Sequence, residues 1–277
     1  MGGFSLAGLV LLMATWSFAG ATAPVGADEP GLPPPAPGFQ IVHEGPGLSL
    51  HDEMFVLPYT HADRYHGQQA EVVFRLSAKQ ALAGSRLYVG YNQLSYWQAY
   101  YVEQSSPFRN TDYNPALFYR LPRRPWRGGL VGADVGFEHE SNGQRAGLSR
   151  SWNHVYVAPH FQAGGLLVRA RLRWRLPEDP KETPDSARGD DNPDLTDYLG
   201  HADLHVYRRW SSELQAYLLL RGNPRTGHGF ASLKLSRRLP HEQNAWLVLM
   251  VSHGYGESLL DYDRMVTRAG IGFMLAR

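Results

Sequence analysis

The sequence predicts an all-β fold: a twelve-stranded antiparallel transmembrane β-barrel of a bacterial outer membrane. Apolar and polar residues alternate with a two-residue period along segments of about ten residues, the length of a tilted membrane strand. The first 27 residues carry no charge, as expected of an exported chain. The 15 tyrosines and 7 tryptophans are enough to form aromatic belts at both membrane interfaces. Alternation alone also fits a soluble sandwich, and the other two observations favour the barrel.

The N-terminal part of the chain is expected to precede the barrel. Residues 1–27 form an uncharged, mostly apolar run that ends in small residues just before Asp28, which predicts a secretory signal peptide. Residues 28–53 are a Pro-rich N-terminal lead-in. We expect the β-barrel domain over residues 54–277, where the first alternating segment begins.

Each predicted strand is a short run rich in Val, Leu, Tyr, Phe and Trp between turn-forming residues. The clearest is 166–176, in which four arginines alternate with apolar residues. In a barrel these arginines face the lumen, where we expect them to pair with carboxylates such as Glu138 and Glu140. The longest connection, 177–195, is acidic and Pro-rich, as an external loop would be. The predicted strands are 54–60, 68–77, 85–101, 113–121, 130–141, 151–161, 166–176, 196–209, 213–221, 228–238, 245–254 and 265–275.

Composition excludes several classes of function. The 27 Lys and Arg residues are balanced by 26 Asp and Glu residues, which argues against a nucleic-acid partner. Cysteine is absent, so the protein has neither a disulfide framework nor a thiolate metal site nor a cysteine nucleophile. The motifs G-x-S-x-G, H-E-x-x-H and the P-loop are also missing. Any catalytic residues must therefore form a different motif.

The strongest chemical pattern lies in residues 136–153, GFEHESNGQRAGLSRSWN. His139 and Ser141 are two residues apart on one predicted strand, so their side chains project from the same face. Asn153 lies on the next strand, where antiparallel pairing brings it beside His139. Serine hydrolysis needs a nucleophile, a base and a group that orients the base, and Ser141, His139 and Asn153 can fill these roles in that order. Gly143 can offer a backbone N–H to an oxyanion hole.

These polar side chains lie on a face that is otherwise apolar. Val135 and Phe137 precede His139 with the same parity, and Val155 follows Asn153. A His-x-Ser pair also arises by chance in a chain with 12 histidines. Polar groups on a lipid-facing surface are costly, however, unless they have a function. A catalytic site on this face would suit a substrate that is itself a lipid.

Five segments together identify a known family, and they span most of the chain beyond residue 54. They are SSPFRNTDYNPALF (105–118), HESNG (139–143), SRSWN (149–153), DDNPD (190–194) and HGYGESLLDYD (253–263). With these segments the sequence resembles the outer-membrane phospholipase A family of Gram-negative bacteria. The resemblance implies a twelve-stranded barrel, a triad at His139, Ser141 and Asn153, and a requirement for calcium and for a homodimer.

The same resemblance implies calcium ligands at a dimer interface. Ser105 matches a backbone-carbonyl ligand from the opposite protomer, and Ser149 matches a side-chain ligand. Gln144 matches a carbonyl ligand at a position where the family often has Arg, and Asp191 matches an acidic residue near the site. Oxygen ligands of this kind suit a hard cation. Gln93 matches a polar residue that pairs across the family's dimer interface.

Two features of the sequence depart from the family. Ala146 stands where relatives often carry Asp, which bears on a second calcium site. The chain ends in Leu275-Ala276-Arg277, whereas barrels of this type usually finish on an aromatic residue.

The expected function is that of a calcium-dependent phospholipase that hydrolyses sn-1 and sn-2 acyl esters of glycerophospholipids and is active as a homodimer. Its site would face the outer leaflet of the outer membrane. Two other functions stay open: a lipid A deacylase, which also presents His-x-Ser on a barrel exterior, and a porin or structural barrel without chemistry. The SRSWN segment and the chain length favour the phospholipase over the deacylase, and the arginine-rich lumen argues against an open channel.

Overall fold

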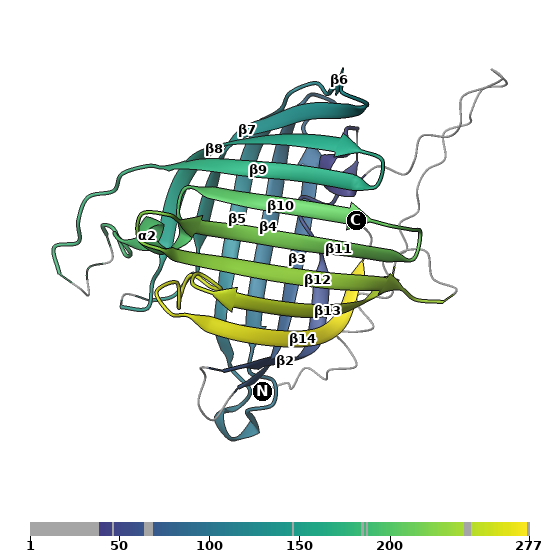
Figure 1. The fold of residues 1–277 in the computed structure, drawn as a ribbon. Coiled ribbons are helices and arrows are strands. Elements are labelled where there is room, and N and C mark those ends of the chain that lie inside the picture. The colour runs from purple at the N-terminus through teal and green to yellow at the C-terminus, as the bar shows by residue number, and fades with distance from the viewer. Residues whose placement is uncertain are drawn as a thin grey trace, which may run out of the picture. The chain divides into compact units, whose positions relative to one another are not determined.

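Twelve antiparallel strands form a closed barrel in the computed structural model (Figure 1), which confirms the predicted fold class. The structure describes residues 39–275 apart from 46, 64–68, 146, 184, 185, 187 and 241–244. The predicted signal peptide, residues 28–38 of the lead-in, Ala146 and the last two residues of the chain lie outside the described residues. The barrel strands are β2 (Phe55–Ala62), β3 (Ala70–Ala81), β4 (Leu87–Trp97), β5 (Phe108–Arg120), β7 (Gly129–Ser141), β8 (Ser151–Ala163), β9 (Leu166–Arg175), β10 (Ala202–Arg209), β11 (Leu214–Asn223), β12 (His228–Arg238), β13 (Ala245–Gly254) and β14 (Val266–Leu275).

The barrel strands pair in chain order, and β2 pairs with β14, so the first and last barrel strands meet. Two short strands lie outside the twelve: β1 (Leu48–Ser49) pairs with β3, and β6 (Arg124–Trp126) pairs with β7. The described helical segments are η1 (Gln40–Val42), η2 (Val102–Gln104) and α2 (Leu195–Leu199). None of these helices has the length and apolar character needed to cross a membrane.

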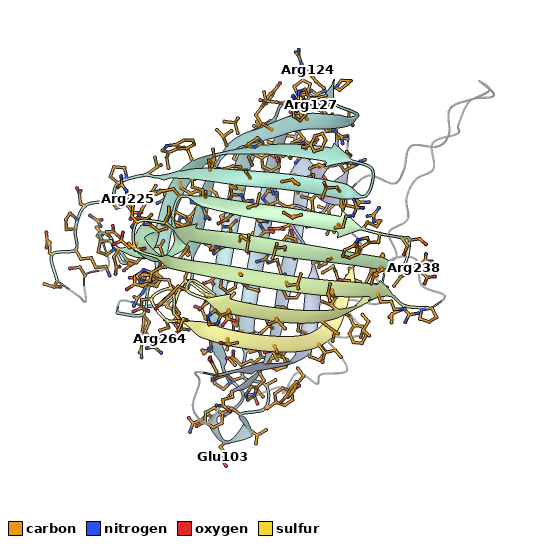
Figure 2. The ribbon with its side chains drawn as sticks, in the orientation of Figure 1. Glu103, Arg124, Arg127, Arg225, Arg238 and Arg264 are labelled. Carbon is orange, nitrogen blue, oxygen red and sulfur yellow. The ribbon has the colours of Figure 1, made fainter. Side chains whose placement is uncertain are left out.

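The two ends of the barrel differ in the length of their connections (Figure 1). Short turns join β8 to β9 and β10 to β11 at one end, where β2 also begins and β14 finishes. The opposite end carries the long loops, among them 98–107, 142–150, 176–201 and 255–265. Single-chain bacterial barrels place short turns in the periplasm and long loops outside the cell. Arg225 and Arg264 lie at the long-loop end and Arg238 at the short-turn end (Figure 2).

Several predicted strand boundaries differ from the structure: the strand predicted as 113–121 begins at Phe108, and the strand predicted as 68–77 runs on to Ala81. The segment predicted as 85–101 ends as a strand at Trp97. The segment predicted as 196–209 begins instead with helix α2, in which Leu195 and Leu199 are one helical turn apart and pack in a buried cluster with Trp152. Gly200 ends this helix with a φ of 67°. The apolar spacing before Gly200 is therefore helical, and β10 begins only after it.

The lumen is packed with ion pairs, as the arginine row of β9 predicts. Arg171 pairs with Glu138 at 3.1 Å. Glu140 instead accepts a hydrogen bond of 2.8 Å from the indole of Trp152. The other pairs of the arginine row are Arg169–Asp134 at 3.5 Å, Arg173–Asp203 at 2.5 Å and Arg175–Asp190 at 2.6 Å.

Much of the described lead-in packs inside the barrel, where Ile41 and Val42 are buried, while β1 pairs with β3. The Lys79 ammonium donates to the backbone oxygen of Gln40 at 2.9 Å and to that of Ile41 at 3.0 Å. Glu53 is fully buried and pairs with a lysine of β12 at 2.7 Å. A cavity of about 120 Å³ remains in the lumen. This filling argues against the open-channel alternative.

Loop 255–265 closes the lumen from the long-loop end. Glu257 pairs with Arg268 of β14 at 2.7 Å, and Arg268 also pairs with Glu71 of β3 at 2.8 Å. The backbone N–H of Leu259 donates to the Asp112 carboxylate of β5 at 3.1 Å. These contacts hold loop 255–265 to lumen-facing side chains of β5 and β14.

Arg268→Met is expected to lower the free energy of unfolding by about 3–5 kcal/mol, because it leaves two buried carboxylates without their shared cation. Arg264→Met is the matched control: its side chain is 65% exposed and pairs with Asp261 at 3.5 Å, so we expect a loss of less than about 1 kcal/mol. Denaturant unfolding of the folded barrel in detergent measures both. Equal losses in the two variants would contradict the importance of this buried network.

Candidate active site

Two of the three predicted triad residues, His139 and Asn153, are hydrogen-bonded on the outside of the barrel, and Ser141 lies on the same face. The register of β7 and β8 sets His139 opposite Asn153 and Ser141 opposite Ser151. The Nδ1–H of His139 donates to Oδ1 of Asn153 at 2.9 Å, because an amide oxygen can only accept. Nε2 of His139 is therefore the ring nitrogen that is left to act as a base. Ser141 lies two residues further along β7, on the same face.

This face is the one that meets lipid. Val135 and Phe137, which precede His139 with the same parity, are 44% and 40% exposed, and Val155 beside Asn153 is 40% exposed. The residues of opposite parity, such as Glu138, point into the lumen and are buried. The site therefore lies where β7 and β8 enter the long loop between them, on the apolar exterior.

The loop from 142 to 150 is held by Asn142, a residue that the sequence analysis did not single out. Its buried side chain donates to the carbonyl oxygen of Leu148 at 2.9 Å and accepts from the backbone N–H of Arg150 at 2.9 Å. Asn-Gly directly after a strand is a turn signal that points to such a residue. Asn142 thereby fixes the chain that follows Ser141.

Gly143 occupies a position that favours glycine. Its φ is +61°, and an added Cβ would lie 3.2 Å from the ring of Tyr113. Tyr113 pairs with Ser141 across β5 and β7. The backbone at Gly143 thus passes close to the neighbour of Ser141, and its role as an oxyanion donor stays a prediction.

Two of the predicted calcium positions are side by side. The hydroxyl of Ser149 donates to a carboxylate oxygen of Asp191 at 2.7 Å, across 42 residues of sequence. The other carboxylate oxygen of Asp191 pairs with the ammonium of Lys181. The acidic loop that the sequence places outside the barrel therefore folds back against the loop after Ser141.

The other predicted calcium positions are more dispersed. Gln144 is exposed in the same loop as Ser149. Ser105 is exposed in the loop between β4 and β5, where it follows η2 with a φ of 59°. Within the described residues, no group of three or more His, Cys, Asp or Glu side chains could hold a metal ion. A cation at Ser149 and Asp191 would therefore depend on hydroxyl and carbonyl oxygens as well.

Gln93 lies on the same row around the barrel as the nucleophile. The registers pair Gln93 with Tyr113, and Tyr113 in turn with Ser141. Gln93 accepts from the hydroxyl of Tyr91 at 3.0 Å and donates to the hydroxyl of Ser95 at 3.1 Å. A short polar network thus interrupts the apolar exterior two strands away from Ser141.

Glu178 is a further residue that the sequence analysis missed. Its carboxylate accepts a hydrogen bond of 3.1 Å from Nδ2 of Asn153. It follows Trp174 and Leu176 with the same parity, so extending the outward face of β9 by one more residue would have identified it.

Comparisons with known proteins agree with this geometry. The family model described as Phospholipase A1 matches residues 49–275. The putative phospholipase A1 of Neisseria meningitidis serogroup B is 34% identical over 256 residues, covering 82% of this chain and 65% of that protein. The phospholipase A1 of Escherichia coli K12 is 36% identical over 223 residues, covering 76% of this chain and 71% of that protein. The chain thus spans about two thirds of the length of these relatives.

Solved structures give the same result. The outer membrane phospholipase A from Escherichia coli superposes with a TM-score of 0.73 at 31% identity, covering 82% of this chain and 91% of that one. The Salmonella typhi outer membrane phospholipase dimer with bound calcium superposes with a TM-score of 0.72 at 31% identity, covering 83% and 92%. This chain therefore belongs to the phospholipase A1 family and is a β-barrel of the outer membrane.

Proposed function

We propose that the protein is a calcium-dependent outer-membrane phospholipase that hydrolyses sn-1 and sn-2 acyl esters of glycerophospholipids with Ser141, His139 and Asn153. The observation that carries the proposal is the hydrogen bond of 2.9 Å between His139 and Asn153, with Ser141 beside them on the lipid-facing surface. A soluble esterase must extract its substrate from a membrane. A site on the barrel exterior meets the acyl ester within the membrane.

In the proposed mechanism, Nε2 of His139 takes the proton of the Ser141 hydroxyl as its oxygen attacks the ester carbonyl. The tetrahedral intermediate collapses to an acyl-serine, and the imidazolium gives its proton to the departing glycerol oxygen. Water then attacks the acyl-serine carbonyl as His139 takes its proton, and the imidazolium returns that proton to the departing Ser141 oxygen, which releases the fatty acid and restores the serine hydroxyl. The backbone N–H at Gly143 is the proposed donor to the oxyanion.

The donor set at Ser149 and Asp191 suits calcium, because a hydroxyl and a carboxylate oxygen already lie together there. We include the carbonyl oxygens of Gln144 and Ser105 in the proposed site, the latter from a second protomer. Bound calcium would supply positive charge near the developing oxyanion. The calcium in the Salmonella typhi structure supports this part of the proposal.

A homodimer is the proposed active form. Ser105 lies in a different loop from Ser149, so a ligand set that contains both is more easily completed by two chains than by one. Gln93 stands on the same row as Ser141 and offers a polar pair for the interface. The dimeric state of the Salmonella typhi relative is consistent with this arrangement. The long-loop end carries all these residues, which suits a site facing the outer leaflet.

The direct test is hydrolysis of a glycerophospholipid with different acyl chains at sn-1 and sn-2, presented in mixed micelles to the folded protein. We expect both fatty acids to be released in the presence of calcium, because a site open to the bilayer offers little steric discrimination between the two esters. Mass spectrometry identifies each fatty acid and lysophospholipid. Lipid A is offered as a second substrate in a parallel assay. Release of acyl chains from lipid A alone would favour the deacylase, and release from neither lipid would favour a structural barrel.

A further inference from the structure

The catalytic asparagine has a second partner outside the proposed triad. Nδ2 of Asn153 donates a hydrogen bond to a carboxylate oxygen of Glu178, 3.1 Å away. We propose that Glu178 is a positioning residue that extends the hydrogen-bonded chain from His139 through Asn153 and brings a negative charge to it. The inference rests on the proposed Ser-His-Asn mechanism and adds to it a fourth residue that acts through Asn153.

Backbone pairing places Glu178 next to Asn153. The ladder between β8 and β9 pairs His154 with Arg175, and the backbone N–H of Leu176 then donates to the carbonyl oxygen of Asn153 at 2.8 Å. Side chains alternate along an extended chain, so Glu178 is the next residue after Leu176 with outward parity. The backbone contact at Leu176 therefore places the Glu178 carboxylate beside the side-chain amide of Asn153.

The chain is anchored on both sides of Glu178. Before it, Arg175 pairs with Asp190 at 2.6 Å. After it, the backbone N–H of Asp190 donates to the carbonyl oxygen of Asp179 at 2.8 Å, and Pro180 forms an isolated bridge with Asp190. Glu178 is partly buried between these anchors. A carboxylate held in this way can orient its partner, whereas one on an unanchored loop cannot.

The carboxylate determines how the amide of Asn153 is oriented. With Nδ2 facing Glu178, Oδ1 faces His139 and accepts from its Nδ1–H. A flipped amide would set two acceptors against each other at Glu178. Glu178 therefore selects the amide orientation in which Oδ1 accepts from Nδ1–H of His139, so that Nε2 is the ring nitrogen that faces away from Asn153 and can take the serine proton.

The charge of Glu178 also compensates for a weakness of the triad. A neutral amide stabilises imidazolium less than the carboxylate found at this position in many serine hydrolases. Glu178 supplies a negative charge one hydrogen bond further away, on a lipid-facing surface where water screens it only in part. The interaction gains strength as His139 becomes positive, so it acts mainly in the transition state.

Glu178→Gln is expected to lower kcat about tenfold with little change in KM, because an interaction made mainly in the transition state affects kcat and kcat/KM together. Gln can still accept from Asn153, so this variant removes the charge and keeps the hydrogen bond. Glu178→Asp keeps the carboxylate and should retain more activity than Glu178→Gln. Glu182→Gln is the matched control: it removes one carboxylate from an exposed position of the same loop and should match the parent.

A double substitution gives a result that a purely structural role would not. N153D alone sets two carboxylates against each other, so their repulsion should disturb the orientation of His139 and lower kcat. N153D combined with E178Q removes the repulsion, because an amide can donate to the new carboxylate. The double variant is therefore expected to be more active than N153D alone, although E178Q by itself lowers activity.

The outcomes separate this inference from the proposed function. Full activity in Ser141→Ala would overturn the triad and the inference with it. An inactive Ser141→Ala variant, with Glu178→Gln kinetically equal to Glu182→Gln, would overturn the inference alone. The same holds if the double variant is less active than N153D. Heat-modifiable migration on gels, which reports a folded barrel, is checked for every variant before its kinetics are compared.

Discussion

Ser141→Ala is expected to lower kcat for phospholipid hydrolysis by at least about 1000-fold while leaving the barrel folded, since the substitution removes the proposed nucleophile. Ser141 lies at the end of β7 on the exterior, and the change deletes a single oxygen from a partly exposed position. The folded fraction and the unfolding midpoint should therefore match those of the parent. Fatty-acid release from mixed micelles, measured beside heat-modifiable gel migration, separates chemistry from folding.

Ser151→Ala provides the matched control. Ser151 pairs directly with Ser141 in the register of β7 and β8, and its hydrogen bond to the side chain of Asn192 is donated by the backbone N–H, which the substitution keeps. We expect this variant to retain activity close to that of the parent. Activity of Ser141→Ala above about a hundredth of the parent would contradict the assignment of the nucleophile, because losing it usually costs several orders of magnitude.

Asn153→Ala should have a smaller effect than Ser141→Ala, because a neutral orienting group contributes position rather than a reacting atom. If Asn153→Ala lost as much activity as Ser141→Ala, Asn153 would need a larger role than orientation.

The barrel and the placing of His139 beside Asn153 were predictable from local periodicity. Alternation in β9 gave both the strand and the direction of its arginines, because the two-residue period of a strand fixes which side chains share a face. The same period placed His139 and Ser141 on one face, and antiparallel pairing of the next strand placed Asn153 beside His139. These inferences need only neighbours that are close in sequence or joined by a hairpin.

The features that sequence reasoning missed depend on contacts between distant residues. Residues 39–45 and 47–53 carry no alternation, and lysine and arginine side chains of β3 and β5 hold them by binding the backbone oxygen of Ile41. Helix α2 is only five residues long, so its two leucines give too little pattern to be distinguished from a strand. The role proposed for Glu178 depends on its hydrogen bond with Asn153, 25 residues away in the sequence.

Removal of calcium is expected to lower both the phospholipase activity and the fraction of dimer. The proposed site takes Ser149 and Asp191 from one chain and Ser105 from the other. An ion that binds only the dimer stabilises the dimer by mass action, so calcium affinity and dimer affinity must be linked in both directions. Activity and chemical crosslinking, followed together across a calcium titration in detergent, measure the two responses on one sample.

Single substitutions should then shift the titration in opposite directions. Ser149→Ala removes a proposed ligand and should raise the calcium needed for half-maximal activity about tenfold, which corresponds to about 1.4 kcal/mol. Lys181→Met removes the ammonium that pairs with Asp191, so it should lower the calcium requirement. Gln144→Ala should change little, because its backbone carbonyl remains.

Gln93→Ala tests the interface separately from the metal. A polar pair in an apolar, lipid-facing interface contributes on the order of 1 kcal/mol, so this variant should need several times more protein to dimerise. Its activity per dimer should match the parent, because Gln93 is two strands away from Ser141. Full activity in a strictly monomeric, calcium-free sample would contradict the linkage, since the proposed site is complete only when two chains and the ion come together.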